Sequence, residues 1–346
     1  MSLLKLLKKK NFINLFTTPS HNQKFFILSK FRQFYKYDIS ETDAHNPQEA
    51  LREAEEKASK IYKTKRTHFL TNGSTSGIIA SVLTCVETDD KVLVWKDSHI
   101  CHKNAVKLAG ATPIFYEVEI DEEFGVPKSI NIDYIKNLLV EHNPKAIIVT
   151  SPTYEGIVSD INLIKEICNR TGTYLIVDEA HGALYPFSDK LPQSAVNIAD
   201  FTVQSLHKTA GGLNPTALLH NNTNLDSDKA LALINTTSPS YPLLASIEKN
   251  INYLNSSKGR KKIDELIENI KELKNNCKNV EFCDYNDITK ILIKSPSISG
   301  YELSEKLYEN RIEDEKTNEK SSMLLTGLGT DKQKLRVLEK VLNKLN

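Results

Sequence analysis

The sequence of 346 residues carries almost no net charge, since 45 Lys and Arg residues are balanced by 44 Asp and Glu residues. Proteins that bind nucleic acids usually present a surplus of positive charge, which is lacking here. No stretch reaches the ~20 apolar residues that a membrane-spanning helix requires. We therefore expect neither nucleic acid nor a membrane as a partner.

Cysteine is scarce and irregularly placed. The chain has no Cys-x-x-Cys pair, and its odd number of cysteines indicates neither a disulfide framework nor a zinc site. A reducing, cytoplasmic location fits this usage best. The five residues are Cys85, Cys101, Cys168, Cys277 and Cys283.

The order of apolar segments predicts an α/β protein. Short β-branched or apolar runs alternate with helix-length segments, which favours a largely parallel sheet that is buried on both faces. We expect an N-terminal arm over 1–47, whose first sixteen residues form a helix packed on this protein or a dimer partner, with membrane-surface binding as the alternative. A large domain follows over 48–245, and a small α+β domain over 246–346. The strands are expected at 68–70, 91–95, 112–116, 146–150, 174–177 and 201–204, and in the small domain near 279–283, 289–294 and 322–325.

A hydroxyl-rich turn follows the first of these strands, in the sequence Thr-Asn-Gly-Ser-Thr-Ser-Gly over 71–77. Its backbone N–H groups and hydroxyls could bind a phosphate at the N-terminus of the next helix, and an ordinary helix cap is the alternative. It is not a P-loop, because no Gly-Lys-Ser/Thr follows at the required spacing.

Acidic and imidazole side chains follow the strand at 174–177. Asp178 and His181 would lie at the carboxyl edge of the sheet, where open α/β sheets bind ligands, and an Asp there could keep a pyridine nitrogen protonated. A strand-end cap and a satisfied polar residue are the alternatives. The string Asp-Glu-Ala-His also occurs in helicases, but the missing P-loop argues against that class.

Two further strand ends carry reactive groups. Lys208 follows the strand at 201–204, where burial would favour the neutral amine that attacks an aldehyde; a surface lysine is the alternative. His102 follows the strand at 91–95 and could stack on a flat cofactor ring. Metal binding by His99, Cys101 and His102 is the competing interpretation, but a fourth ligand is lacking, and we expect no metal.

Together these segments resemble the ornithine/lysine/arginine decarboxylase family of fold-type-I pyridoxal-phosphate (PLP) enzymes. The resemblance covers nearly the whole chain and rests on motifs that occur in the family's order. They are Thr18-Pro19-Ser20-His21, Asp38-Ile39-Ser40-Glu41, Asn72 to Ser76, Cys101-His102-Lys103, Pro152 to Gly156, Asp178 to Ala183, Ser205 to Thr209, Thr237 to Tyr241 and Leu325 to Thr330.

The resemblance implies a fold-type-I architecture, with a mostly parallel seven-stranded sheet in the large domain and a small C-terminal α+β domain. It implies that Lys208 forms the Schiff base with PLP, Asp178 pairs with the pyridinium nitrogen, His102 stacks on the ring and Ala180 packs on its other face. His181 would lie near the ring hydroxyl. The phosphate would be held by Ser74, Thr75, Ser76, Ser205 and His207.

The implied activity is decarboxylation of lysine, ornithine or arginine through an external aldimine, in a homodimer or larger assembly with the site at the interface and Tyr241 near the partner's site. Transamination on the same scaffold is the first alternative, and a non-catalytic regulatory paralogue is the second. The sequence departs from the family pattern at Leu184 and at Asn214-Pro215. The family's C-terminal domain is also expected to be absent.

Overall fold

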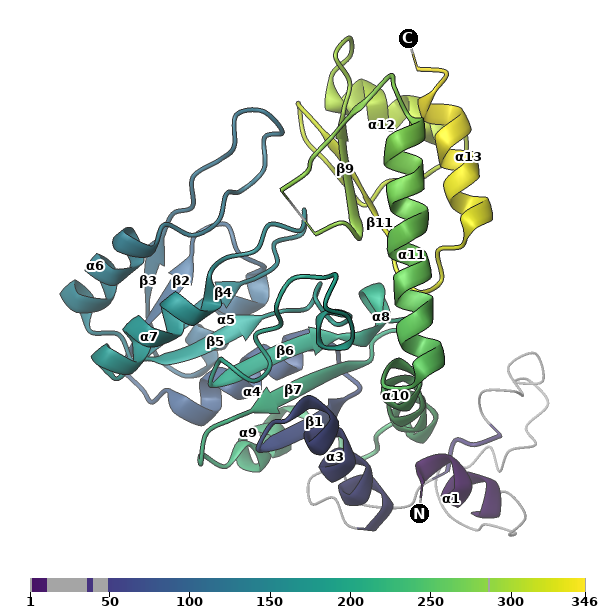
Figure 1. Ribbon diagram of the computed structural model, residues 1–346. Helices are drawn as coiled ribbons and strands as arrows, with labels where there is room; N and C mark the ends of the chain where they lie inside the picture. Colours follow the sequence, from purple (N-terminus) through teal and green to yellow (C-terminus); the bar gives the residue numbers. More distant parts are fainter. Residues whose placement is uncertain (1, 11–35, 40–48, 286, 346) are drawn as a thin grey trace.

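The structure is a computed structural model that describes residues 2–10, 36–39, 49–285 and 287–345 (Figure 1). The motif at 18–21 and the second half of the motif at 38–41 lie outside the described residues. All other segments that support the family resemblance are described.

A seven-stranded sheet forms the centre of the larger part of the molecule, with the strand order β1-β7-β6-β5-β4-β2-β3. The five strands from β3 to β6 in this order run parallel, whereas β7 is antiparallel to both β6 and β1. The predicted mostly parallel α/β sheet is therefore confirmed, and β7 is a strand that the sequence pattern did not reveal. The strands are β1 (Arg66–Leu70), β2 (Lys91–Trp95), β3 (Thr112–Tyr116), β4 (Ala146–Thr150), β5 (Tyr174–Asp178), β6 (Phe201–Ser205) and β7 (Ala217–Asn221).

Helices cover both faces of this sheet (Figure 1). Side chains alternate along each strand, so Ile148 of β4 packs with α4 (Ser74–Cys85), α5 (Ile100–Leu108) and α9 (Ser227–Ile234), whereas Ile147 packs with α6 (Ile132–His142) and α7 (Ile161–Thr171). Both residues are fully buried. Burial on two faces explains why the strands read as continuous apolar runs.

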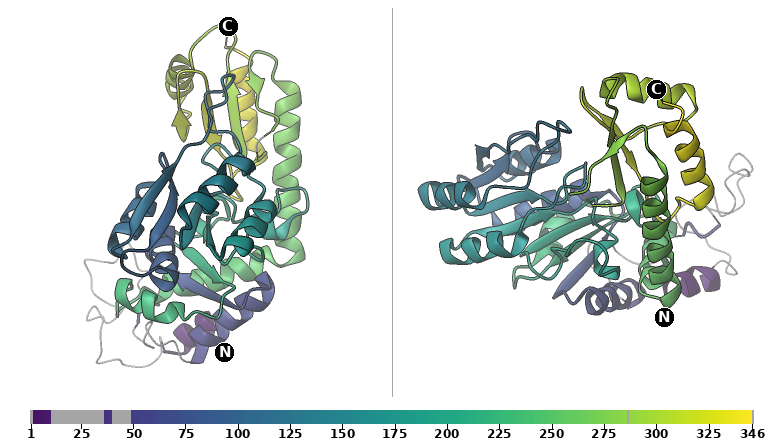
Figure 2. Two further views of the ribbon diagram at one scale, coloured as in Figure 1. Left: turned by 90° about the vertical axis from the view of Figure 1, so that its left-hand side faces the viewer. Right: turned by 45° about the horizontal axis from the view of Figure 1, so that its top comes forward.

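A second, antiparallel sheet lies at one end of the molecule (Figure 2), with the order β10-β11-β9-β8. Its strands and the helices beside them come from the C-terminal part of the chain. They are β8 (Glu281–Phe282), β9 (Lys290–Lys294), α12 (Gly300–Glu309), β10 (Lys316–Thr317), β11 (Ser322–Leu325) and α13 (Lys332–Leu342).

Two helices connect the two sheets. They are α10 (Tyr241–Leu254) and α11 (Ser257–Asn276), so the domain boundary expected at 245 falls inside α10. The Ser256 hydroxyl caps α11 by accepting a hydrogen bond from the backbone of Gly259 at 3.1 Å. A Cβ atom at Gly259 would lie 2.0 Å from the Tyr253 carbonyl oxygen, so only glycine permits this close approach between the helices.

The N-terminal helix α1 (Leu3–Lys10) packs against α10 and α3 (Glu49–Tyr62) of its own chain. Its apolar face is buried, and the Leu3 N–H donates to the Glu248 carboxylate at 2.9 Å. This agrees with the prediction that the N-terminal helix packs on its own protein. Among the described helices, none has the length and apolar character needed to cross a bilayer.

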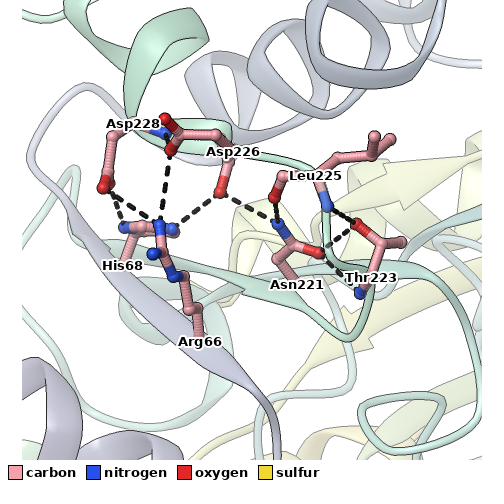
Figure 3. Close-up of polar contacts among 8 residues, drawn as sticks. Arg66, His68, Asn221, Thr223, Leu225, Asp226 and Asp228 are labelled. Carbon is pink, nitrogen blue, oxygen red and sulfur yellow. Dashed lines mark hydrogen bonds and ion pairs between the residues drawn. The ribbon is translucent and has the colours of Figure 1, made fainter.

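Polar side chains tie the edge strand β1 to the start of α9 (Figure 3). The Arg66 guanidinium contacts the carboxylates of Asp226 and Asp228 at 3.3 Å and 3.0 Å, and His68 Nε2 lies 2.8 Å from the Ser227 hydroxyl. The ion pairs are half exposed and add little stability by themselves. Together these contacts connect β1 to the start of α9.

Helix α3 covers the other side of β1. Its Glu55 carboxylate accepts a hydrogen bond from the Phe69 N–H at 2.9 Å, which satisfies a backbone donor of the edge strand. Burial raises the pKa of Glu55 to about 8, although this hydrogen bond acts in the opposite direction. The group therefore carries a proton at neutral pH.

Candidate active site

A cavity of about 260 Å³ opens at the carboxyl ends of β4, β5 and β6. In Figure 1 the arrows of β5 and β6 point toward this region and toward the short helix α8 (Leu206–Thr209). Ligands bind at this edge of open α/β sheets because the connections that leave parallel strands diverge there. The cavity is lined by Asn72, Gly73, Ser74, Thr75, His99, Cys101, Thr150, Tyr154, Asp178, Ala180, His181, His207, Lys208 and Pro215.

Asp178, the last residue of β5, supplies a buried carboxylate. Its Oδ2 lies 2.9 Å from His102 Nε2, and its Oδ1 accepts a hydrogen bond from the Ala180 N–H at 3.0 Å. Burial disfavours the ionised carboxylate, but the hydrogen bond and charge of His102, together with the charge of Lys208, lower the pKa of Asp178 to about 2. The cavity therefore holds a fixed negative charge.

Lys208 lies on α8, directly after β6. Its Nζ is 2.9 Å from His181 Nε2 and 5.4 Å from the centre of the Tyr154 ring. Burial lowers the pKa of Lys208, while the charge of Asp178 opposes this effect. The site thus promotes the neutral amine, which is the nucleophilic form.

His181 completes this contact set. Its ring centre lies 4.6 Å from that of Tyr154. Burial, followed by the charges of Lys208 and Lys290, holds the pKa of His181 well below its usual value. The imidazole is therefore neutral and can exchange a proton with Lys208.

The N-terminus of α4 faces the same cavity. Gly73 adopts a φ of 78°, which favours glycine, and Ser74 and Thr75 line the cavity beyond it. The Ser76 hydroxyl donates instead to the Gly73 carbonyl at 2.8 Å and does not line the cavity. Exposed N–H groups and hydroxyls at a helix N-terminus form an anion site.

The segment after β6 adds polar groups near this helix end. His207 lines the cavity while its Nδ1 lies 3.0 Å from the Thr216 carbonyl oxygen. Ser205 is fully buried, and its hydroxyl has no hydrogen-bond partner among the residues that the structure describes. Such an unpaired buried hydroxyl is costly to the fold, although Ser205 itself does not line the cavity.

The structure brings most of the predicted site residues to one cavity. Ser76, His102 and Ser205 are the predicted residues that do not line it, and the ring-stacking role of His102 stays a prediction. Cys101, His102 and Asp178 each place a possible ligand atom within 4.8 Å of the others. The sequence offered His99, Cys101 and His102 as possible metal ligands. The group that the structure brings together contains Asp178 instead of His99.

Several lining residues had no role predicted from the sequence. Tyr154, in the Pro-Thr-Tyr-Glu-Gly motif, is the most informative because its ring contacts both His181 and Lys208. Its position in a family motif was the available signal. Thr150 ends the strand predicted over 146–150 and Pro215 belongs to a departure from the family pattern, but neither was assigned a role in the site.

The sheet order, the small second sheet and the cavity at the strand ends define the fold-type-I class of PLP-enzyme folds. The chain belongs to the Orn/Lys/Arg decarboxylase family. Residues 14–296 match the major domain of that family, described as "Orn/Lys/Arg decarboxylase, major domain". This agrees with the family resemblance found in the sequence.

Curated relatives include an uncharacterised Bacillus subtilis protein, YaaO, which is 31% identical over 304 residues, covering 83% of this chain and 63% of that protein. An arginine decarboxylase of Halalkalibacterium halodurans is 29% identical over 326 residues, covering 88% of this chain and 66% of that protein. The chain thus spans just under two thirds of the length of these relatives.

Among solved structures, a lysine decarboxylase of Francisella novicida superposes with a TM-score of 0.87 at 22% identity, over 99% of this chain and 59% of that one. The constitutive lysine decarboxylase of Escherichia coli gives a TM-score of 0.83 at 19% identity, over 99% of this chain and 60% of that one. At these identities the similarity establishes the fold.

Proposed function

We propose that the chain binds PLP covalently at Lys208 and decarboxylates a basic amino acid: lysine, ornithine or arginine. The observation that carries this proposal is the placement of a desolvated lysine amine and an ionised aspartate in one cavity, beside a helix N-terminus. Family membership supplies the type of reaction.

The residues present fit PLP. The cofactor has an aldehyde, a ring nitrogen and a phosphate, and the cavity offers an amine, a carboxylate and an anion site for them in turn. The unpaired hydroxyl of Ser205 and the unpaired Nδ1 of His181, both buried, give further polar groups without partners among the described residues. Asp178 would hold the ring nitrogen, and Ser74, Thr75 and His207 would hold the phosphate.

The chemistry that PLP supplies when bound is the withdrawal of electrons from a bond at the α-carbon of the amino acid. Lys208 provides the attachment point and, once released, an amine that can carry a proton. His181 lies within hydrogen-bond distance of that amine, so the pair can hold or deliver a proton after CO2 has left. Asp178 remains ionised and supplies a negative charge to the site.

A basic substrate is favoured by negative charge near the cavity. After Asp178, the Glu315 carboxylate exerts the largest attraction on the charge of Lys208, and it also acts on Tyr154. Glu315 is exposed, in the segment between α12 and β10. We propose that it attracts the distal amine or guanidine of the substrate.

Exposed apolar side chains next to the cavity support a homodimer with the site at its interface. Ile100 and Leu213 are 59% and 48% exposed, and each lies within two residues of side chains that line the cavity. Light scattering of the purified protein tests this part of the proposal, and a monomer at micromolar concentration would contradict it.

The cofactor is tested by adding PLP to the purified protein and recording visible absorbance. Lys208→Ala should abolish the absorbance of the lysine-bound cofactor. The matched control is Lys96→Ala, which removes an exposed lysine at the end of β2 and should change nothing. A wild-type protein that takes up no PLP would refute the proposal.

The reaction is tested by incubating the loaded protein with lysine, ornithine and arginine in turn. Release of CO2 together with the corresponding amine supports decarboxylation. Keto acid without CO2 would instead indicate the transamination considered above. A loaded protein that converts none of the three would contradict the proposed substrate class.

A further inference from the structure

A fully buried lysine lies outside the cavity, at the start of β9. The side chains of Lys290 and Asp287 are both 0% exposed and form an ion pair at 2.6 Å. Removing two charges from water costs several kcal/mol per ion, and an apolar pair of similar volume would often be as stable. A role other than stability is therefore needed to explain the pair.

The Lys290 ammonium has three donors and uses them on three acceptors. They are the His181 carbonyl oxygen at 2.5 Å, Asp287 Oδ2 at 2.6 Å and Thr289 Oγ1 at 3.1 Å. Two of these acceptors belong to the turn that leads into β9 of the small sheet, whereas the His181 carbonyl belongs to the turn after β5 in the large sheet. The ammonium therefore connects the two sheets.

Asp287 extends this connection. Its carboxylate accepts a hydrogen bond from the Tyr185 hydroxyl at 2.8 Å, and its N–H donates to the Gly156 carbonyl at 2.8 Å. Gly156 has a φ of 91°, and an added Cβ would lie 3.1 Å from the Asp287 nitrogen, so glycine permits the close approach. The turn that carries Tyr154 and the turn that carries His181 are thus held by one ion pair.

We propose that Lys290, held by Asp287, is a positioning residue that sets His181 and Tyr154 against Lys208. This inference rests on the proposed function, because it assigns a task to Lys290 within the same reaction. Lys290 is not among the residues that line the cavity, and it contacts the backbone of His181, which is. In this way the small sheet influences the proton-exchanging pair without contributing a side chain to the cavity.

Electrostatics supports the same role. After burial and the charge of Lys208, the charge of Lys290 lowers the pKa of His181. Lys290 also acts in the same direction on the pKa of Lys208. Losing its charge should therefore raise the pKa of His181 and make its imidazole hold a proton more readily than in the wild type.

The test uses Lys290→Met, which keeps an unbranched side chain but removes the charge and the three donors. In cofactor-free protein, the imidazole NMR signals of His181, assigned with His181→Gln, are followed against pH. We expect His181 to protonate at a pH higher by about one unit than in the wild type. In PLP-loaded protein, the pH midpoint of the visible absorbance should also move.

The matched control is Lys294→Met on the same strand. Lys294 also forms ion pairs, with Glu123 and Glu281 at 2.9 Å each, but these partners belong to surface segments away from His181. The variant should leave both pH values unchanged. A shift of equal size in the control would overturn the proposal, because it would then reflect a general loss of positive charge.

A second variant keeps the test decisive if Lys290→Met fails to fold. Lys290→Met with Asp287→Asn leaves no uncompensated buried charge, so it should fold and still raise the pH at which His181 protonates. The proposal would be overturned if the variants lost stability but kept the wild-type pH of His181 protonation and the wild-type pH midpoint of the visible absorbance. An unfolded double variant would also overturn it. A wild-type protein without PLP absorbance would refute the proposed function, while the cofactor-free titration would still test Lys290.

Discussion

Replacing Asp178 with asparagine tests whether the cavity stores electrostatic energy in an ionised carboxylate. Asparagine has nearly the same shape and resembles the protonated acid, so the substitution removes the charge with little change in packing. In the folded protein the pKa of Asp178 is about 2, against 3.8 for an ordinary aspartate. At about 1.36 kcal/mol per unit of pKa, this difference corresponds to roughly 2 kcal/mol of stability at neutral pH.

The pH dependence follows from the direction of this pKa change. Because the pKa is lowered on folding, the contribution of Asp178 is fully present above pH 3.8 and is lost as the pH falls toward 2. Asp178→Asn should therefore unfold at lower urea concentration than the wild type at pH 7 and at pH 5. The difference between the two proteins should become smaller below about pH 4.

Urea unfolding of the cofactor-free protein, followed by circular dichroism, measures this difference. Asp189→Asn, at an exposed position after η2 (Tyr185–Phe187), is the control and should match the wild type at every pH. The reasoning would be refuted by an Asp178→Asn protein as stable as the wild type at pH 7, or by a difference that stays constant down to pH 3.

Two further predictions concern glutamates. The pKa of Glu55 is raised on folding from 4.5 to about 8, so its contribution to stability is fully present below pH 4.5 and is lost as the pH rises through 8. Glu55→Gln keeps the acceptor oxygen but cannot ionise. Urea unfolding should show this variant to be more stable than the wild type at pH 8 and equally stable at pH 4. The control, Glu56→Gln at an exposed position, should show no such pH dependence. Glu315→Gln should raise KM for the basic substrate by about three- to fivefold with little change in kcat, as expected for one exposed charge pair. Its control, Glu313→Gln, should leave KM unchanged, and an equal effect of both would argue against a specific role for Glu315.

The sequence revealed the strands in which apolar or β-branched residues predominate. β4 reads Ala-Ile-Ile-Val-Thr and was predicted with its observed bounds, because burial on both faces makes nearly every position apolar. β7 reads Ala-Leu-Leu-His-Asn, and its two polar residues hid it although all five residues are buried. His220 is accommodated there in part because the Thr67 hydroxyl of the neighbouring strand lies 2.9 Å from its Nδ1. That partner comes from a distant part of the sequence.

For the candidate site, too, some features could be predicted from the sequence and others could not. Lys208, Asp178 and the turn at 73–75 could be identified because each follows a strand in a motif of the family, and parallel strands bring their carboxyl ends to one edge of a sheet. The hydrogen bond that Ser76 makes to Gly73 could not be read from the motif, since a hydroxyl at a helix start can turn inward or outward. Its rotamer depends on packing in the folded chain.

The sequence by itself determined the α/β class and the family, and it suggested the residues that we propose to hold PLP, because these depend on local periodicity and on motifs that are contiguous in the chain. The tertiary structure alone decided which groups touch. It placed His181 on Lys208, and it buried the Lys290–Asp287 pair between the two sheets. The physical reason is that burial and close approach between distant segments set the protonation and orientation of these groups, and neither property is encoded in a single segment.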